Sequence, residues 1–460
     1  MPNTLSNAFL EHLRQIFGAD GQSIAAADCL SYGYDNSRQQ ALAQAVVWPG
    51  NAEQVQALVQ LCRAERVALT ARGRGTNTTG ASVPVAGGVV VSFERMRRII
   101  EIDPDNRAAR VEPGVLNADL QAALAPHGLF WPPDPTSAAY SSIGGNLACN
   151  AGGPRAVKYG ACRDNVLAVQ AIAGNGDWLR CGARTSKGAT GYDLVRLLVG
   201  SEGTLALITE ATLKVVPLPA GRSSLRARYR TVDAAAAAVA RIMRQPSTPS
   251  ALEFMDATAL RLAREVGGAD LPAAGALLLI EVDGNPDTLA AAVAAVRHAA
   301  EGEGCDAVET ADSAAAAEQL WSARKALSPA LRQIAPEKIN EDVVVPVSKL
   351  PDLVAAVQQI SQRHGIAMVS FGHAGNGNLH VNLMFDPAVA AQAAAAPLAL
   401  SELFDTVLAL GGTLSGEHGI GLAKRPFMTR AIDPATLAMM RAIKHCFDPD
   451  AILNPGKLLP

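Results

Sequence analysis

Residues 132–160 have the sequence PPDPTSAAYSSIGGNLACNAGGPRAVKYG. The stretch combines glycine with small hydroxyl and amide side chains, which leave the backbone open to an extended polar ligand. An irregular loop is the simplest alternative, but loops of this length in a compact domain are usually functional. We therefore expect these residues to line a ligand.

Two more glycine-rich segments lie on either side of this stretch. Arg72-Gly73-Arg74-Gly75-Thr76-Asn77 follows a predicted strand, VALTARG (67–73), and such a turn can hold a phosphate on successive backbone N–H groups. It matches neither the dinucleotide fingerprint nor the P-loop, because the next glycine is Gly80 and no Gly-Lys-Ser/Thr follows. LVGSEGTL (198–205) precedes the strand-like ALITEATLKVV (206–216), and its Glu202 would also suit a helix cap or the surface.

Two glycine-rich motifs near the C-terminus contain histidine. FGHAGNGNLHVN (371–382) predicts a strand, a turn and a strand, so that His373 and His380 can converge on one point. SGEHGIG (415–421) adds Glu417 and His418. Two histidines and a glutamate are a common ligand set for a divalent metal with open coordination positions. The alternative is that each is an ordinary hydrogen-bonded group, but three of the eight histidines lie in these motifs, which favours a site.

Taken in order, the glycine-rich motifs resemble a known family. RGRGTN, PPDPTS…GGNLACNAGG and GSEGTLALITEATLKVVPLP are similar to the FAD-binding domain of the vanillyl-alcohol oxidase/p-cresol methylhydroxylase (PCMH) superfamily. The histidine motifs resemble its branch of FAD-linked D-lactate, D-2-hydroxyglutarate and glycolate dehydrogenases, including glycolate oxidase FAD subunits. The resemblance runs from about residue 40 to 460 and is weakest across 220–310. It implies an α+β fold with a two-subdomain FAD-binding domain of PCMH type and a cap domain whose antiparallel sheet is covered by helices.

The resemblance also implies which residues hold FAD. The pyrophosphate would lie on the first glycine-rich loop, Ile208 on the adenine side, and Asn454 near the isoalloxazine. The expected cofactor contacts are Arg72, Gly73, Arg74, Gly75, Thr76, Pro135, Thr136, Ser137, Gly144, Gly145, Asn146, Gly152, Gly153, Glu202, Gly203, Ile208 and Asn454. Because no histidine lies in 72–80 or 132–160, we expect non-covalent FAD.

For the histidine motifs the resemblance implies a metal site and a base. His373, His380 and Glu417 would hold a divalent metal, zinc in preference to manganese, and His418 would be the catalytic base. The implied reaction oxidises a D-2-hydroxy acid to the 2-oxo acid, with hydride transfer from C2 to flavin N5. A metal lowers the pKa of the substrate hydroxyl, and an imidazole that titrates near neutral pH suits removal of its proton.

The substrate carboxylate needs a cation. Arg324 in LWSARK (320–325) matches the family's carboxylate-binding arginine and suits a bidentate pairing, although it would also suit a solvated surface. Further substrate contacts are expected at Ser328, Lys338 and Asn382. The register of Lys338 stays open, and Asn340 and Glu341 stay unassigned. D-lactate is the favoured substrate and D-2-hydroxyglutarate the alternative.

The patterns predict four parts of the chain. These are an N-terminal helix and connector (1–35), the FAD-binding domain (36–220), the cap or substrate domain (221–410) and a C-terminal helical segment that returns to the FAD domain (411–460). In the cap domain TVDAAAAAVARIMR and DTLAAAVAAVRHAAE predict helices, and ALEFMD and ALLLIEVDG predict strands.

Composition limits the partners and the location. The chain has 460 residues, a formal net charge of -3 and no basic block, so a nucleic-acid partner is not expected. Seven cysteines without a CxxC motif suit a reducing compartment. The N-terminus lacks the pattern of a secretory signal, and the longest apolar stretch, 273–282, is too short to span a bilayer. We expect a cytoplasmic protein, with peripheral contact to the inner membrane left open.

The sequence leaves more than one alternative for the electron acceptor and for the oligomeric state. A dehydrogenase of this kind would pass electrons to a quinone, an electron-transfer flavoprotein or a cytochrome, and a homodimer is one alternative for the assembly. Three other functions compete: an FAD-dependent alkyl transferase, a metal hydrolase without flavin, and a non-catalytic electron-transfer subunit.

Overall fold

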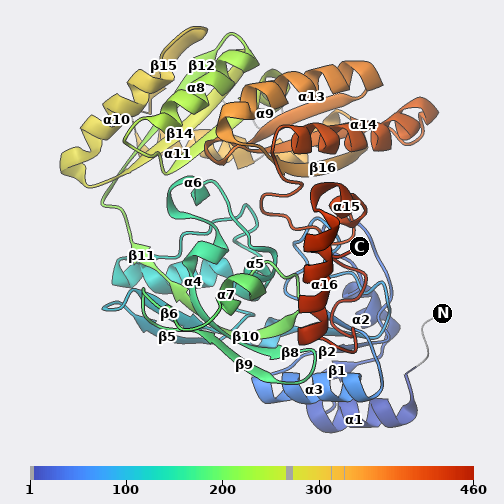
Figure 1. Ribbon diagram of the computed structural model, residues 1–460. Helices are drawn as coiled ribbons and strands as arrows, with labels where there is room; N and C mark the ends of the chain where they lie inside the picture. Colours follow the sequence, from blue (N-terminus) through green and yellow to red (C-terminus); the bar gives the residue numbers. More distant parts are fainter. Residues whose placement is uncertain (1–4, 266–272, 312, 326) are drawn as a thin grey trace. The chain divides into compact units, whose positions relative to one another are not determined.

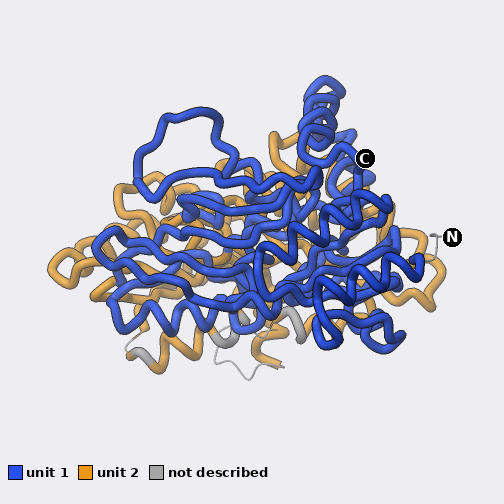
Figure 2. Tube along the Cα trace, turned by 90° about the horizontal axis from the view of Figure 1, so that it is seen from below, with its two compact units in different colours: residues 1–152, 160–218, 417–460 blue, residues 153–159, 219–416 orange. Residues whose placement is uncertain are grey.

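The computed structural model describes residues 5–265, 273–311, 313–325 and 327–460 (Figure 1). The chain divides into two compact units, which Figure 2 colours separately. Unit 1 consists of residues 1–152, 160–218 and 417–460, and unit 2 of residues 153–159 and 219–416. Among the described residues, no helix is both long enough and apolar enough to cross a membrane.

Unit 1 begins with a four-stranded sheet of order β1-β2-β4-β3. Its strands are β1 (Gln22–Ser23), β2 (Ala45–Val47), β4 (Val89–Ser92) and β3 (Leu69–Arg72). Both β2 and β3 run parallel to β4, and a helix connects β2 to β3. The apolar faces of α1 (Asn7–Phe17) and α3 (Ala52–Ala64) share one core with this sheet. Helix α3 is capped at its start, since the Asn51 side chain accepts a hydrogen bond from the Gln54 N–H at 2.9 Å.

The second sheet of unit 1 is five-stranded and antiparallel, with order β5-β6-β10-β8-β9. Its strands are β5 (Ile99–Asp103), β6 (Ala108–Val111), β10 (Ala206–Lys214), β8 (Val166–Ala173) and β9 (Trp178–Gly182). The strands β7 (Leu129–Phe130) and β11 (Val216–Pro217) form a separate two-stranded antiparallel sheet. The other helices of the unit are α2 (Ala26–Ser31), α4 (Asn117–Leu124), α5 (Ile143–Cys149), α7 (Leu194–Leu198), α15 (Met428–Ala431) and α16 (Pro434–Phe447).

Unit 2 is built on a seven-stranded sheet in which every pairing is antiparallel. In spatial order the strands are β15 (Cys305–Thr310), β12 (Gly221–Tyr229), β14 (Ala276–Gly284), β13 (Ala251–Asp256), β17 (Ala367–His373), β18 (Asn378–Phe385) and β16 (Glu337–Val344). Its helices are α6 (Ala156–Tyr159), α8 (Val232–Arg244), α9 (Ala257–Glu265), α10 (Pro286–Ala300), α11 (Ala314–Lys325), α12 (Leu327–Ala330), α13 (Leu350–His364) and α14 (Ala390–Ala409). The predicted helices and strands of the cap domain are therefore all present.

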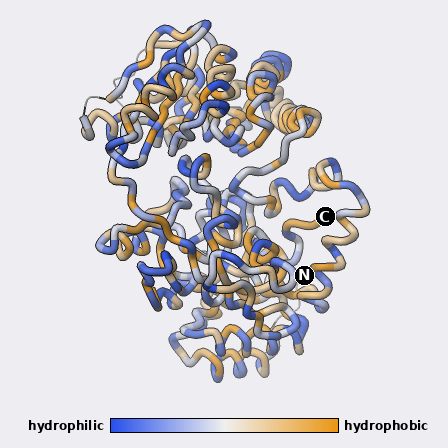
Figure 3. Tube along the Cα trace, turned by 60° about the vertical axis from the view of Figure 1, so that its left-hand side comes forward, coloured by the Kyte–Doolittle hydropathy of each residue, from blue (hydrophilic) through white to orange (hydrophobic). Residues whose placement is uncertain are grey.

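Helices cover both faces of this sheet. The helices α8, α10, α13 and α14 contact one another and the strands, whereas α9, α11 and α12 form a second group. Met255, Leu277, Leu279 and Phe371 form a core with this second group, because alternate side chains of a strand point to the same face. Hydrophobic and hydrophilic residues alternate along the helices, as expected when one side of each packs on the sheet (Figure 3).

One short segment of unit 2 comes from the middle of the FAD-binding sequence. Residues 153–159 carry α6, which contacts β13. Lys158 Nζ donates to both the carbonyl and the carboxylate of Asp283, and the Tyr159 hydroxyl donates to the same carboxylate at 2.8 Å. Burial, followed by the bond to Asp283, raises the pKa of Tyr159. The sequence patterns do not predict this association, because the partners are more than a hundred residues apart.

Replacing the Asp283 carboxylate should weaken the attachment of residues 153–159 to the sheet of unit 2. For Asp283→Ala we expect a loss of about 1–3 kcal/mol in the free energy of unfolding, since Lys158 and Tyr159 lose their common acceptor. Thermal unfolding of the FAD-loaded protein measures it. Asp287→Ala, at an exposed position on α10, is the control and should change little. Equal melting temperatures for the two variants would contradict this account.

Candidate active site

A tight hairpin brings the two histidines together. Strands β17 and β18 are joined by a turn in which Gly377 has φ +70°, and a Cβ there would lie 1.9 Å from the carbonyl oxygen of Val345. Glycine is required at this position because a side chain would collide with the backbone. The ring centroids of His373 and His380 lie 5.2 Å apart, at an interplanar angle of 84°. The predicted convergence across the turn is therefore present.

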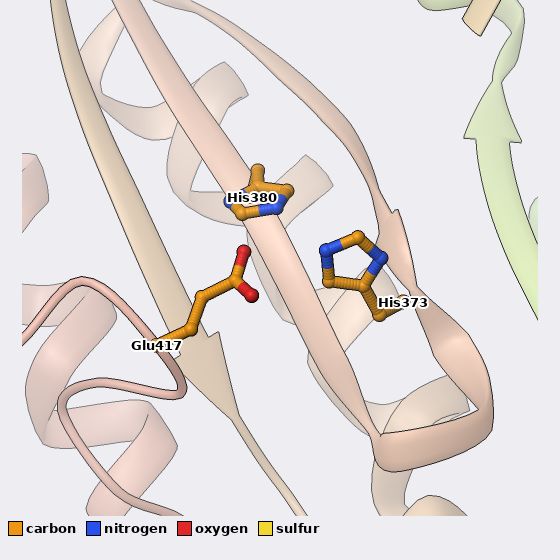
Figure 4. A group of neighbouring side chains, drawn as sticks. All are labelled: His373, His380 and Glu417. Atoms are coloured by element: carbon orange, nitrogen blue, oxygen red, sulfur yellow. The ribbon is translucent and has the colours of Figure 1, made fainter. Parts of the chain in front are cut away.

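Glu417 completes a group of three side chains that could hold a metal ion. One ligand atom from each of His373, His380 and Glu417 lies within 4.8 Å of the others, and Figure 4 shows the two imidazoles and the carboxylate pointing toward one another. Both histidines are buried and Glu417 is half-buried. No other group of three such ligands occurs in the described parts of the chain. Two imidazole nitrogens and a carboxylate oxygen fit a divalent transition metal, as the sequence predicts.

Asp342 fixes the turn that leads to Glu417. Its buried carboxylate accepts hydrogen bonds from the Gly416 N–H at 2.8 Å and from the Ser415 hydroxyl at 3.1 Å. The Gly416 N–H also reaches the Asp342 carbonyl oxygen at 3.0 Å. Asp342 lies directly opposite His380 in the β16–β18 pairing. We assigned no role to Asp342 from the sequence, although an aspartate directly before the apolar residues VVVP could have indicated a buried functional carboxylate.

A second buried carboxylate contacts His373. Glu253 lies opposite His373 in the β13–β17 pairing, and its Oε1 is 2.5 Å from His373 Nδ1. Its other oxygen, Oε2, accepts a hydrogen bond from Arg324 Nε at 2.8 Å. Burial would raise the pKa of Glu253, but the neighbouring His373 and the Arg324 guanidinium outweigh it and lower the pKa to about 2. Glu253 was missed in the sequence, where it is the one charged residue within the apolar run ALEFM.

The expected substrate-binding residues lie around this group. Arg324 is nearly buried, and its guanidinium lies 4.6 Å from the ring centroid of Phe371, so it is not a solvated surface charge. The register pairs Lys338 with Met384 and Asn340 with Asn382, which places these residues on the sheet face of His380. The buried amide oxygen of Asn382 has no hydrogen-bond partner among the described residues. The side chain of Ser328 lies outside the described part of the structure.

In unit 1 the three glycine-rich segments lie side by side. A Cβ on Gly73 would be 2.5 Å from Ser142 Oγ, and one on Gly203 would be 3.0 Å from the Ala71 Cβ. Gly144, at the start of α5, is as tightly placed, since its Cβ would be 2.5 Å from that of Pro113. Small residues at these positions therefore allow the segments to approach closely.

Several buried polar atoms on or next to these segments lack hydrogen-bond partners within the described part of the chain. They are Thr78 Oγ1, Ser141 Oγ and Asn146 Nδ2. Buried polar atoms are normally paired, so such a group indicates a polar ligand that belongs there. The combination of close-packed glycines and unpaired polar atoms fits the extended, polar part of a dinucleotide cofactor.

Other expected cofactor residues already have roles within the protein. Arg72 is buried and its Nη1 donates to the Tyr34 carbonyl oxygen, whereas Arg74 is exposed and lies 3.5 Å from the Glu94 carboxylate. Burial lowers the pKa of Arg72. The Asn454 amide donates to the carbonyl oxygens of Ala81 and Glu202. Ile208 is half-buried beside the core of the five-stranded sheet. Thr136 is exposed, whereas Gly152 and Gly153 are buried.

The loop that carries His418 is attached to two of the glycine-rich segments. The Asn77 amide donates to the His418 carbonyl oxygen at 2.8 Å. The fully buried carboxylate of Glu202 accepts from the N–H groups of Ile420 at 2.6 Å and Gly421 at 2.8 Å, and burial raises its pKa. Glu202 thus holds the GEHGIG loop, and its contact with a cofactor stays a prediction. Asn77 is a further positioning residue that the sequence analysis did not single out.

Comparison with known proteins identifies the family. Residues 43–182 match a family model described as "FAD binding domain", and residues 218–458 match one described as "FAD linked oxidases, C-terminal domain". The chain belongs to the FAD-linked oxidase family. It is therefore an FAD-linked oxidoreductase, and FAD is the cofactor that the glycine-rich segments of unit 1 fit. The resemblance noted in the sequence is confirmed.

Three curated relatives cover almost the whole chain. The glycolate oxidase subunit GlcD of Bacillus subtilis (strain 168) is 38% identical over 97% of this chain and 96% of the relative. The D-lactate dehydrogenase of Anaerostipes hadrus is 35% identical, covering 92% and 90%. The D-2-hydroxyglutarate dehydrogenase of Stutzerimonas stutzeri (strain A1501) is 35% identical, covering 95% and 96%.

The solved structures show the fold. A p-cresol methylhydroxylase structure matches with a TM-score of 0.82 at 16% identity, covering 99% of this chain and 98% of that one. The predicted α+β fold with a PCMH-type FAD-binding domain is therefore confirmed.

Substitution of Gly144 tests the packing of the glycine-rich segments. In Gly144→Ala the new methyl group would overlap Pro113 and displace the start of α5, so we expect a loss of about 1–3 kcal/mol in stability and a lower flavin content. The ratio of flavin to protein absorbance after purification measures the latter. Gly188→Ala, which would meet nothing within 4 Å, should keep the wild-type ratio. A fully loaded, equally stable Gly144→Ala protein would refute the prediction.

Proposed function

We propose that this chain oxidises a small D-2-hydroxy acid to the corresponding 2-oxo acid with a divalent metal bound at His373, His380 and Glu417. The observation that carries the proposal is the convergence of these three side chains in an FAD-linked oxidoreductase. D-lactate is the favoured substrate and D-2-hydroxyglutarate the alternative. The printed names of the relatives support this range, since they include glycolate, D-lactate and D-2-hydroxyglutarate enzymes.

Each group in the proposed site has a distinct role. Bound FAD would accept the two electrons, and a bound metal, zinc rather than manganese, would lower the pKa of the substrate hydroxyl. His418 would accept the hydroxyl proton, because an imidazole is the side chain best suited to general-base work near neutral pH. The hydrogen bond from Asn77 and the two bonds to Glu202 hold the loop that presents it.

The substrate's carboxylate would pair with Arg324. This guanidinium contacts the same Glu253 that contacts His373, so carboxylate binding and metal binding would occur close together. The Asn382 amide oxygen, which lacks a partner among the described residues, would accept a hydrogen bond from the substrate. Asn340 and Lys338 lie further along the same sheet face and would meet the side chain of a longer acid.

The electron acceptor and the assembly belong to the proposal as well. Electrons would pass to a quinone, an electron-transfer flavoprotein or a cytochrome, in a cytoplasmic enzyme, with peripheral contact to the inner membrane as an alternative location. One relative is named a subunit, so assembly with other chains competes with a homodimer. An alkyl transferase is the second candidate, but it would leave the His373–His380–Glu417 group without a role.

Removal of the base should stop the reaction without releasing the cofactor. For His418→Ala we expect kcat to fall by about 10²–10⁴-fold while the flavin spectrum is unchanged, since proton transfer is lost but the backbone bonds of the loop remain. Steady-state turnover of D-lactate with an artificial acceptor measures it. His445→Ala, at an exposed position of α16, is the control. Wild-type turnover in His418→Ala would exclude the assigned base.

Removal of the metal should abolish the reaction but leave FAD bound to the protein. We expect a strong chelator to abolish 2-hydroxy acid oxidation and leave the flavin bound, because the metal ligands lie on β17, β18 and the Glu417 turn rather than on the glycine-rich segments. Added Zn²⁺ should restore activity in the wild type but not in His380→Ala. Metal analysis of each sample accompanies the assay. Full activity in a sample shown to be metal-free would refute the metal requirement.

A further inference from the structure

We propose that Glu253 is a positioning residue that fixes the tautomer of His373 and thereby the metal affinity, while holding Arg324 in place for the substrate carboxylate. The inference rests on the proposed function. Both oxygens of one carboxylate are bonded to side chains of the site: Oε1 to His373 Nδ1 at 2.5 Å and Oε2 to Arg324 Nε at 2.8 Å.

The tautomer follows from the hydrogen bonds. Arg324 Nε always carries a proton and therefore donates to Glu253. The carboxylate has no solvent exposure and faces the permanently charged Arg324 guanidinium, so it acts as an acceptor on both sides, and His373 Nδ1 is the donor to Oε1. A neutral His373 then carries its lone pair on Nε2. Figure 4 shows one ring nitrogen of His373 facing Glu417 and the other facing away, which matches this arrangement.

The location of Glu253 argues against a role in stability alone. Its side chain has no solvent exposure and its neighbours in the strand, Leu252 and Phe254, are buried apolar residues. Burial of a charged pair costs desolvation energy, and a well-packed apolar group in its place is often as stable. An apolar group could not accept a hydrogen bond from His373. Carboxylates in this position raise the basicity of a ligating imidazole and fix its orientation.

Glu253→Gln changes the hydrogen-bonding pattern with little change in shape. The amide has one acceptor and one donor end, and Arg324 requires the acceptor. The NH₂ group then faces His373 Nδ1 and favours the tautomer whose proton is on Nε2. A protonated Nε2 has no lone pair and cannot bind the metal. We expect Zn²⁺ affinity to fall by about 10–100-fold, the usual effect of losing such a partner.

The test uses the FAD-loaded full-length protein. Zn²⁺ affinity is measured by competition with a chromogenic chelator for wild type, Glu253→Gln and a matched control, Glu281→Gln. Glu281 lies on the neighbouring strand β14, where its carboxylate accepts from the Ser250 hydroxyl at 3.1 Å. The control should bind Zn²⁺ like the wild type. Wild-type affinity in Glu253→Gln would overturn the proposal.

A second measurement needs no folded variant of Glu253. In the wild-type, Zn²⁺-loaded holoflavoprotein labelled with ¹⁵N-histidine, long-range ¹H–¹⁵N correlations report which ring nitrogen carries the proton, and His373→Ala assigns the signal. We expect His373 with its proton on Nδ1. A proton on Nε2 would refute the inference even if Glu253→Gln failed to fold. Absence of Zn²⁺ binding by the wild type would instead contradict the proposed function, so the two failures are distinguishable.

Discussion

The register of four antiparallel strands is the constraint on which the proposed metal site depends. In β13, β17, β18 and β16 the pairing places Glu253 opposite His373, Phe371 opposite His380, and His380 opposite Asp342. A slip of one residue in any strand would turn its side chains to the other face. The two imidazoles, their buried carboxylates and the candidate substrate residues Lys338 and Asn382 share a face for this reason.

In unit 1 the candidate residues are brought together by close backbone contacts between loops rather than by strand register. The three glycine-rich segments pack so closely that a Cβ on Gly73 or Gly203 would contact a residue of, or next to, a neighbouring segment. Asn77 and Glu202, one from the first segment and one from the third, then hold the loop of His418 through its backbone. The residues expected to hold FAD and those expected to present the base are thus parts of one hydrogen-bonded arrangement.

Much of this could be predicted from local sequence, and the remainder depends on long-range pairing. The glycine spacing around His373 and His380, the strand ALEFMD and the helix start at Asn51 are local signals, and the structure matches them. The roles of Glu253, Asp342 and Asn77 are not local. Each depends on a partner more than 70 residues away in the chain, at Gly416 for Asp342, His373 for Glu253 and His418 for Asn77. The same holds for residues 153–159, which carry helix α6 and whose partner Asp283 lies on strand β14.

The central claim is that a D-2-hydroxy acid reduces the flavin at a metal site. The most direct measurement is the visible flavin absorbance of the metal-loaded protein, mixed without oxygen with D-lactate, L-lactate, glycolate and D-2-hydroxyglutarate in turn. The account predicts bleaching by a D-2-hydroxy acid, D-lactate foremost, and none by L-lactate. Bleaching by L-lactate alone, or by none of these acids, would contradict it.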